Sequence, residues 1–222
     1  MNADLPGAAL LLDGRRDDEP TLALAHDALV DGLAAGGWAV DDWLLRDDKI
    51  AWCAGCFKCW TTTPGLCAHH DGGREVAERW VPSDLVVFLT PVTFGGYSSQ
   101  LKKALDHVIP VLQPFMRTRA GETRHPQRYE RRRDLLVVGT APAGQAGGPE
   151  AQTFRRLVER NTYNMEPTRW TTGVLEQGTN DWEVRVAVNA LLAEVGVHAE
   201  RDAVGMDAAR DAIGAGRNEV VA

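Results

Sequence analysis

The sequence predicts an α/β protein in which one parallel sheet is covered by helices on both faces. Segments typical of strands and of helices alternate along the whole chain. The clearest strand, Asp84 to Pro91, is almost continuously apolar, as expected for a strand that is buried on both faces. The 222 residues, 44% of them apolar, are enough for one large domain with a proper core.

Five segments have the pattern of strands. The first is a short apolar run that ends at the turn residues Asp13 and Gly14. The second is the least regular, because Asp41 and Asp42 interrupt it. The other three are apolar runs between loops. We expect these segments to form a five-stranded sheet from residues 8–12, 38–45, 84–91, 135–139 and 170–175.

The helical segments lie between these strands. Pro20 opens the first helical pattern, and Gly36 follows its last apolar position. Ser98 or Ser99 can cap a later helix that runs to Ile109. Further helices are expected over residues 74–80, 150–165 and 181–195. We therefore predict one domain, 1–198, with a cysteine-rich loop at 53–67 and a polar insertion at 110–133, followed by a tail, 199–222.

Charge and composition exclude several classes of protein. The net charge of −7 argues against binding nucleic acid or an anionic membrane. The first residues lack a basic region followed by an apolar one, and no apolar stretch is long enough to cross a bilayer, so we expect a cytoplasmic protein. All four cysteines lie between Cys53 and Cys67. In a reducing compartment such a group indicates metal or redox chemistry rather than disulfides.

In a parallel sheet, ligands bind outside the carboxyl ends of the strands, at the switch in strand order. Three loops are expected there: 13–20, 91–97 and 141–149. In the second loop, Gly95 and Gly96 let the backbone approach a flat ligand, and their amides could bond the polar edge of a flavin. Phe94 or Tyr97 could cover the ring. The alternative is an ordinary strand-to-helix turn with a core aromatic. The third loop could close over the other side of the ring or be a flexible surface loop.

The segment PVTFGGYSSQLKKALD resembles the isoalloxazine loop of the NADPH-dependent FMN reductase and iron–sulfur flavoprotein families. The resemblance extends from the first strand to about the fifth. It implies a flavodoxin-like three-layer sandwich with a five-stranded parallel sheet, bound FMN, NAD(P)H as co-substrate, and a homodimer or homotetramer. By matching, the flavin-ring contacts would be Pro91, Val92, Thr93, Phe94, Gly95 and Gly96.

The loop after the first strand departs from the family pattern. Members usually place Ser, Thr and Asn there, so that hydroxyls and amides can cradle the phosphate. Here Arg15 or Arg16 could pair with a phosphate and Thr21 could supply a hydroxyl, but three acids at 17–19 lie beside them. Carboxylates that fill the site would leave FMN weakly bound or differently placed. Alternatively, the acids simply complement the dipole of the helix that follows.

The cysteines are spaced C-x2-C-x2-C-x7-C, and thiols at such short intervals can wrap a compact inorganic cluster. The spacing resembles the motif with which iron–sulfur flavoproteins hold a [4Fe–4S] cluster near FMN. Two alternatives stay open: a packing motif without a cluster, and a zinc site with His69 or His70 in its shell. The metal ligands would be Cys53, Cys56, Cys59 and Cys67.

Together these features predict an FMN-dependent oxidoreductase that transfers electrons from NAD(P)H to a small-molecule or protein acceptor, with or without a [4Fe–4S] cluster. We assign no catalytic acid or base, because the cofactor performs the hydride chemistry. One alternative is an electron carrier that works with a protein partner such as ferredoxin. Another is a sensor whose cysteines respond to redox state or metal. The basic stretch 117–133 could bind the phosphate of NADPH or such a partner, or be a solvated insertion.

Overall fold

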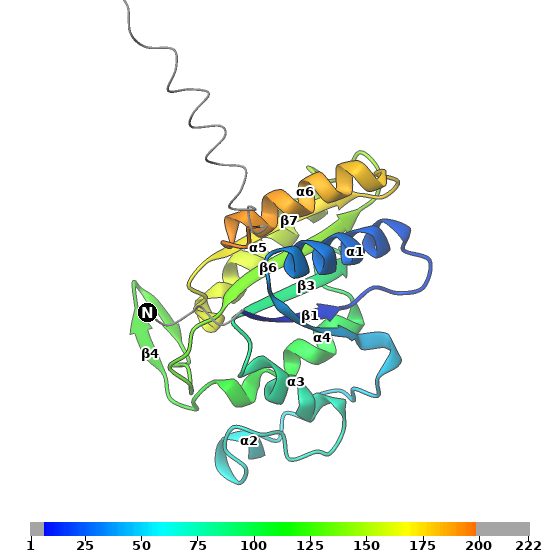
Figure 1. The fold of residues 1–222 in the computed structure, drawn as a ribbon. Coiled ribbons are helices and arrows are strands. Elements are labelled where there is room, and N and C mark those ends of the chain that lie inside the picture. Colours follow the sequence, from blue (N-terminus) through cyan, green and yellow to red (C-terminus); the bar gives the residue numbers. More distant parts are fainter. Residues whose placement is uncertain (1–6, 199–222) are drawn as a thin grey trace, which may run out of the picture.

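The protein is a three-layer α/β sandwich around one parallel sheet (Figure 1). This computed structural model describes residues 7–198, so the predicted tail at 199–222 lies outside the described residues. The five strands lie in the order β2-β1-β3-β6-β7, and every neighbouring pair is parallel. The strands are β1 (Ala8–Asp13), β2 (Ala39–Leu44), β3 (Leu85–Pro91), β6 (Asp134–Ala141) and β7 (Trp170–Glu176). The five-stranded parallel sheet predicted from the sequence is therefore confirmed.

The central strands are apolar on both faces because helices cover both. Alternate residues of β1 and β3, such as Leu11 and Val87, face α1 and α6. Their neighbours, such as Leu10 and Phe88, face α3, α4 and α5. Figure 1 shows α1 and α6 together on one side of the sheet. The helices are α1 (Pro20–Ala35), α3 (Gly72–Trp80), α4 (Ser99–Asp106), α5 (Pro149–Met165) and α6 (Asp181–Glu194).

The strand order determines where along the edge of the sheet a ligand can bind. From β1 the chain first adds β2 on one side and then returns to form β3 on the other side of β1. The loops that leave the carboxyl ends of β1 and β3 therefore diverge to opposite faces, and a crevice opens between them.

Several elements differ from the prediction. The helix expected to reach Ile109 ends at Asp106, and Ile109–Val111 form a separate 3-10 helix, η2. Pro110 explains why α4 does not continue, because proline cannot donate to the carbonyl of Asp106, four residues earlier, and its ring clashes with that carbonyl. A one-turn helix, α2 (Lys58–Thr61), lies within the cysteine segment and was not predicted.

The insertion at 110–133 contains a small antiparallel hairpin, β4 (Arg117–Arg119) and β5 (Glu122–Arg124), at the amino end of the sheet. The carboxylate of Glu166, almost fully buried at the end of α5, pairs there with three arginines. These are Arg117, Arg124 and Arg132. Much of the basic stretch thus holds the insertion in place, away from the carboxyl edge. Within residues 7–198, no helix is both long and apolar enough to span a bilayer.

His26 of α1 connects this helix to the edge of the sheet. Its two ring nitrogens lie 2.9 Å from Asp27 Oδ1 and 2.8 Å from Asp42 Oδ2. Burial lowers the pKa of His26, but the two carboxylates outweigh burial and raise it above its ordinary value. A raised pKa stabilises the fold at low pH, and this contribution disappears as the pH rises through the folded-state pKa.

We predict that His26→Ala reduces the free energy of unfolding by about 1 kcal/mol at pH 5.5, and by less at pH 8.5. Urea denaturation at several pH values measures this. His70→Ala, at an exposed histidine, is the matched control. If His26→Ala reduces the free energy of unfolding by as much at pH 8.5 as at pH 5.5, the role of the two ion pairs is contradicted.

Candidate functional site

The three loops predicted to bind a ligand meet at the carboxyl edge of the sheet. Residues 14–19 follow β1, residues 92–98 follow β3 and residues 142–148 follow β6. Hydrogen bonds join the first loop to the second and the second loop to β6: Ser98 Oγ donates to the carbonyl of Gly14 at 2.6 Å, and the amide of Val92 donates to the carbonyl of Thr140 at 2.8 Å. The loops therefore form one continuous surface above β1, β3 and β6.

Ser98 fixes the geometry between the first two loops. Its buried hydroxyl accepts the amide of Leu101 at 3.2 Å and so caps α4, while its own amide donates to Thr90 Oγ1 at 2.9 Å. Gly14 has no space for a side chain, because an added Cβ would lie 2.7 Å from both Ser98 Oγ and Leu101 Cβ. The start of α4 thus packs directly on the backbone of the β1 loop.

A tight turn forms the tip of the second loop. The amides of Thr93 and Gly96 donate to each other's carbonyls at 2.9 and 2.8 Å. Phe94 and Gly95, between them, have φ of +50° and +73°, the two positive values of a type I′ turn. Gly95 packs on α5, where an added Cβ would lie 2.7 Å from Thr153 Cβ. The amide of Gly96 is thus engaged inside the turn.

Phe94 is the aromatic side chain that this turn presents. Its side chain is 92% exposed, and a bulky residue at positive φ is uncommon and strained. Such strain persists where the surrounding structure enforces it, and it is found most often at functional sites. Pro91 and Val92 lead into the turn from the buried end of β3. The turn therefore offers an apolar ring beside backbone atoms, a surface suited to a flat heteroaromatic ligand.

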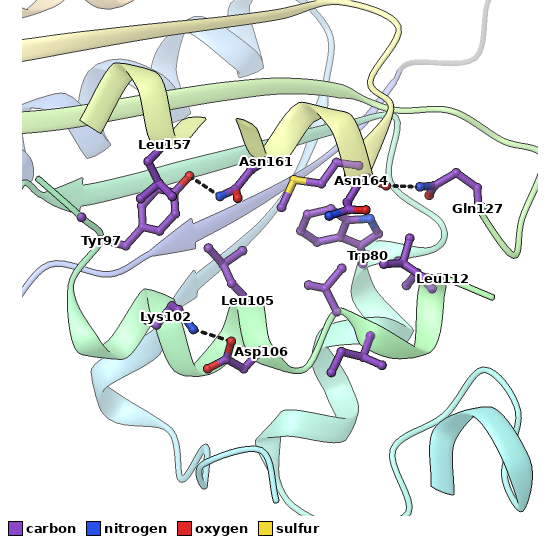
Figure 2. A pocket seen from close by; sticks show the side chains of 15 residues that line it. Trp80, Tyr97, Lys102, Leu105, Asp106, Leu112, Gln127, Leu157, Asn161 and Asn164 are labelled. Atoms are coloured by element: carbon purple, nitrogen blue, oxygen red, sulfur yellow. Dashed lines mark hydrogen bonds and ion pairs between the residues drawn. The ribbon is translucent and has the colours of Figure 1, made fainter. Parts of the chain in front are cut away.

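Tyr97 points away from this surface. Its hydroxyl accepts a hydrogen bond from Asn161 Nδ2 at 2.9 Å (Figure 2). Its ring lies edge-on against Phe88 and Phe154. Burial raises the pKa of Tyr97 to about 12. Of the two aromatics predicted as covers for the ring, Tyr97 is therefore part of the core, and Phe94 alone is available.

A cavity of about 440 Å³ lies between α4 and α5 and reaches Gly96 in the turn. Trp80, Leu105 and Met165 form part of its largely apolar wall, with the amides of Asn161 and Asn164 nearby (Figure 2). A lining of this kind suits a neutral apolar molecule.

Of the three residues predicted to contact a phosphate, Arg15 and Thr21 lie at the β1 loop and the start of α1 and already have partners. Arg15 Nε lies 3.0 Å from Asp13 Oδ2, and the Arg15 amide donates to Asp13 Oδ1 at 2.9 Å. Asp13 is fully buried, and burial raises its pKa against the opposing effect of Arg15. Thr21 Oγ1 accepts the amide of Gly178 at 3.0 Å. The amide and Nε of Arg15, two donors expected to meet a phosphate, are thus already engaged by Asp13, whereas the turn after β3 offers a surface suited to a flat ring.

The loop after β6 is held in place by hydrogen bonds to β7 and α5. Glu176, at the end of β7, accepts the amide of Ala146 at 3.2 Å, and Arg155 of α5 donates to the carbonyl of Ala146 at 2.9 Å. Hydrogen bonds from the amides of Gly144 and Ala146 lower the pKa of Glu176. These contacts place the loop at the same edge as the turn, where it can border a bound ring.

The four cysteines lie away from this edge, around a small cavity of about 20 Å³. Its other wall comes from the end of α4, including Asp106 and His107. Burial, with a further contribution from the neighbouring cysteines, raises the pKa of Cys59. Among residues 7–198, no three His, Cys, Asp or Glu side chains converge closely enough to hold a metal ion. The four thiols are free and line one cavity, so the donor type suits a thiophilic metal although the thiols do not converge.

The sequence did not reveal the carboxylates that organise this edge. Asp13 has the sequence context of a turn residue, and Glu176 lies at the end of an ordinary strand. Their partners come from elsewhere in the loops, so spacing alone carried no signal of their roles. Ser98 was predicted as a helix cap, but its bond to Gly14 depends on the arrangement of β1 beside β3.

A parallel sheet of this strand order, with a glycine turn beyond β3 at the switch point, defines a flavodoxin-like protein with a site suited to a flavin ring. Residues 24–165 match the sequence model of the NADPH-dependent FMN reductase family, and the chain belongs to that family. The family predicted from the loop and cysteine motifs is confirmed. This membership supports FMN and NAD(P)H as the groups that the protein uses.

Two curated relatives are iron–sulfur flavoproteins. That of Methanocaldococcus jannaschii is 30% identical over 107 residues, which is 48% of this chain and 54% of the relative. That of Archaeoglobus fulgidus is 29% identical over 84 residues, 38% of this chain and 37% of the relative. The matches thus span about half or less of the relatives' length.

Solved structures show the same fold at low identity. An NAD(P)H:quinone oxidoreductase from Methanothermobacter marburgensis has a TM-score of 0.66 at 12% identity, covering 88% of this chain and 99% of its own. An azoreductase from Bacillus anthracis has a TM-score of 0.59 at 14% identity, covering 85% of this chain and 98% of its own. At these identities the likeness supports the flavodoxin-like fold alone.

We predict that Ser98→Ala lowers the free energy of unfolding by about 1–2 kcal/mol, because it removes the cap of α4 and the bond to Gly14 from a buried position. Urea denaturation measures the loss. Ser99→Ala, at the exposed neighbouring position, is the control and should change stability little. Equal effects of the two substitutions would show that the junction between the loops is unimportant.

Proposed function

We propose that this protein is an FMN-dependent oxidoreductase that transfers electrons from NAD(P)H to an acceptor. The observation that supports this most strongly is the type I′ turn at the switch point, which presents exposed Phe94 at positive φ. Family membership supports the same chemistry. When bound, FMN supplies the hydride acceptor, and the chain supplies position and electrostatics.

The protein's own residues would contribute by shape and backbone. The turn offers a backbone surface without bulky side chains at Gly95 and Gly96, and Phe94 offers an apolar face. Ser98 holds this turn against the β1 loop. No side-chain acid or base is required in this scheme. The proposed ring contacts are Pro91, Val92, Thr93, Phe94, Gly95 and Gly96.

The direct test is steady-state oxidation of NAD(P)H by the purified protein with added FMN and a quinone acceptor.

We predict that Gly95→Ala reduces flavin affinity at least about tenfold, because a Cβ both strains the positive φ and meets Thr153. Quenching of flavin fluorescence reports the affinity.

The matched control is Gly121→Ala in the hairpin, where φ is +78° and nothing lies within 4 Å of an added Cβ. It carries the same backbone strain without the collision and at a distant place, so flavin affinity should be unchanged. A protein that neither binds flavin nor oxidises NAD(P)H would disprove the function.

The cysteines support a finer proposal, that a [4Fe–4S] cluster accepts single electrons beside the flavin chemistry. Four thiols in one cavity and the names of the two curated relatives support it.

We predict that anaerobically purified protein contains iron and sulfide and shows a broad absorption shoulder, and that Cys59→Ser loses most of both. Iron and sulfide analysis beside the absorption spectrum measures this. Flavin absorption bands in a protein that contains no iron would contradict the proposed [4Fe–4S] cluster. Zinc in place of iron would support the alternative that the sequence left open.

A second candidate function is an electron carrier that works with a protein partner such as ferredoxin. Exposed aromatic residues flank the cysteines, with Trp52 66% and Phe57 48% exposed, which suits contact with another protein. A carrier would oxidise no NAD(P)H without its partner, whereas the reductase would. For either candidate function, we also propose a cytoplasmic location and assembly into a homodimer or homotetramer.

A further inference from the structure

The loop between β1 and α1 carries its own anions where a flavin phosphate would be expected. The carboxylate of Glu19 accepts the amide of Arg16 at 2.8 Å, and it also accepts Arg16 Nε at 3.2 Å and Nη2 at 3.0 Å. Only 7% of the Glu19 side chain is exposed. Asp13 engages the amide and guanidinium of Arg15 in the same way. Two loop amides and both arginines are thus bound by carboxylates from within the loop.

The charge of the loop repels a further anion. Between residues 13 and 19 there are four acids and two arginines, a net charge of −2. Arg46 adds one positive charge from outside, but it lies 3.1 Å from Asp17. The cavity of about 190 Å³ at the start of α1 is large enough for a phosphate, yet Asp18 and Glu19 line it.

The start of α1 does not offset the negative charge of the loop. Sites for phosphate at helix starts depend on free amides that point at the anion. The first residue of α1 is Pro20, which has no amide hydrogen. Thr21 Oγ1 accepts the amide of Gly178, which leaves its hydroxyl hydrogen as a single donor beside the acids. One hydroxyl does not offset the net negative charge of the loop, so a dianion is disfavoured here.

We propose that this protein recognises its flavin by the ring and not by the 5′-phosphate, so that neutral riboflavin binds at least as tightly as FMN. This inference rests on the proposed function, since it takes the turn after β3 as the ring site. The carboxylate of Glu19 engages the amide and the guanidinium of Arg16, with which a phosphate would otherwise pair. Flavin is then held by the loops after β3 and β6 and exchanges readily with free flavin.

The test is a titration of the full-length protein, freed of flavin, with riboflavin and with FMN. Flavin-fluorescence quenching and calorimetry give both dissociation constants. We predict an FMN dissociation constant equal to or larger than that of riboflavin. Added salt should tighten FMN binding, because it screens repulsion, and should leave riboflavin binding unchanged.

Two variants isolate the charge. Glu19→Gln keeps the size of the side chain and frees the Arg16 guanidinium, so FMN should bind at least about tenfold tighter while riboflavin does not change. Asp18→Asn removes a second charge at φ +56°, a conformation that Asn also accepts, so it serves where Glu19→Gln fails to fold. The control is Glu130→Gln, which removes one exposed charge in the segment that leads to the amino end of β6.

The outcomes separate this inference from the function itself. Wild-type protein that prefers FMN by about tenfold or more, with binding that weakens in salt, overturns the inference and leaves the proposed oxidoreductase standing. Equal gains in FMN affinity for Glu19→Gln and Glu130→Gln also overturn it, because the effect would then be one of overall charge. Absence of binding by either flavin overturns the proposed function together with the inference.

Discussion

The whole ligand edge depends on the close contact between the start of α4 and the β1 loop. Ser98 donates to the carbonyl of Gly14, and the absence of a side chain at Gly14 lets the two backbones approach. This contact fixes the direction in which the chain leaves β3, and so it fixes the turn from Thr93 to Gly96 and the exposed ring of Phe94. The parallel register of β1 and β3 supplies the scaffold for the contact. A flat binding surface can form here because two buried strands end side by side.

The two ends of the site differ in their electrostatics. At the turn after β3 the chain offers backbone and an apolar ring, with no charged side chain among residues 91–98. At the loop after β1 it offers arginines that are already neutralised by Asp13 and Glu19. Burial of Asp13 and Glu19 makes these pairs hard to exchange for a solvated anion, because a carboxylate released from its partner in a buried position is costly. The fold is thus flavodoxin-like, while the acids of the β1 loop depart from the polar, uncharged pattern that the family resemblance implies there.

The sequence was sufficient for the parts of the structure that depend on local pattern. Continuous apolar runs predicted the strands, and the loops at their carboxyl ends followed from the rule for parallel sheets. Pairing between distant residues could not be predicted. The arginines of the insertion look like a solvated basic surface in the sequence, but three of them pair with buried Glu166. Tyr97 looks like a ring cover by position, but a hydroxyl contact with Asn161 of α5 turns it into the core.

The two sites of redox interest lie at opposite ends of one helix. Ser98 caps the amino end of α4 beside the turn by accepting the amide of Leu101. Asp106, His107, Ile109 and Pro110, at the other end of the helix, form a wall of the cysteine cavity. Eight helical residues span about 12 Å, and α4 is packed on the sheet through Leu101 and Ala104, so this separation is rigid. Within one chain the flavin turn and the thiols therefore do not touch. A cluster held by the thiols would therefore stand about the length of α4 from a flavin at the turn of the same chain.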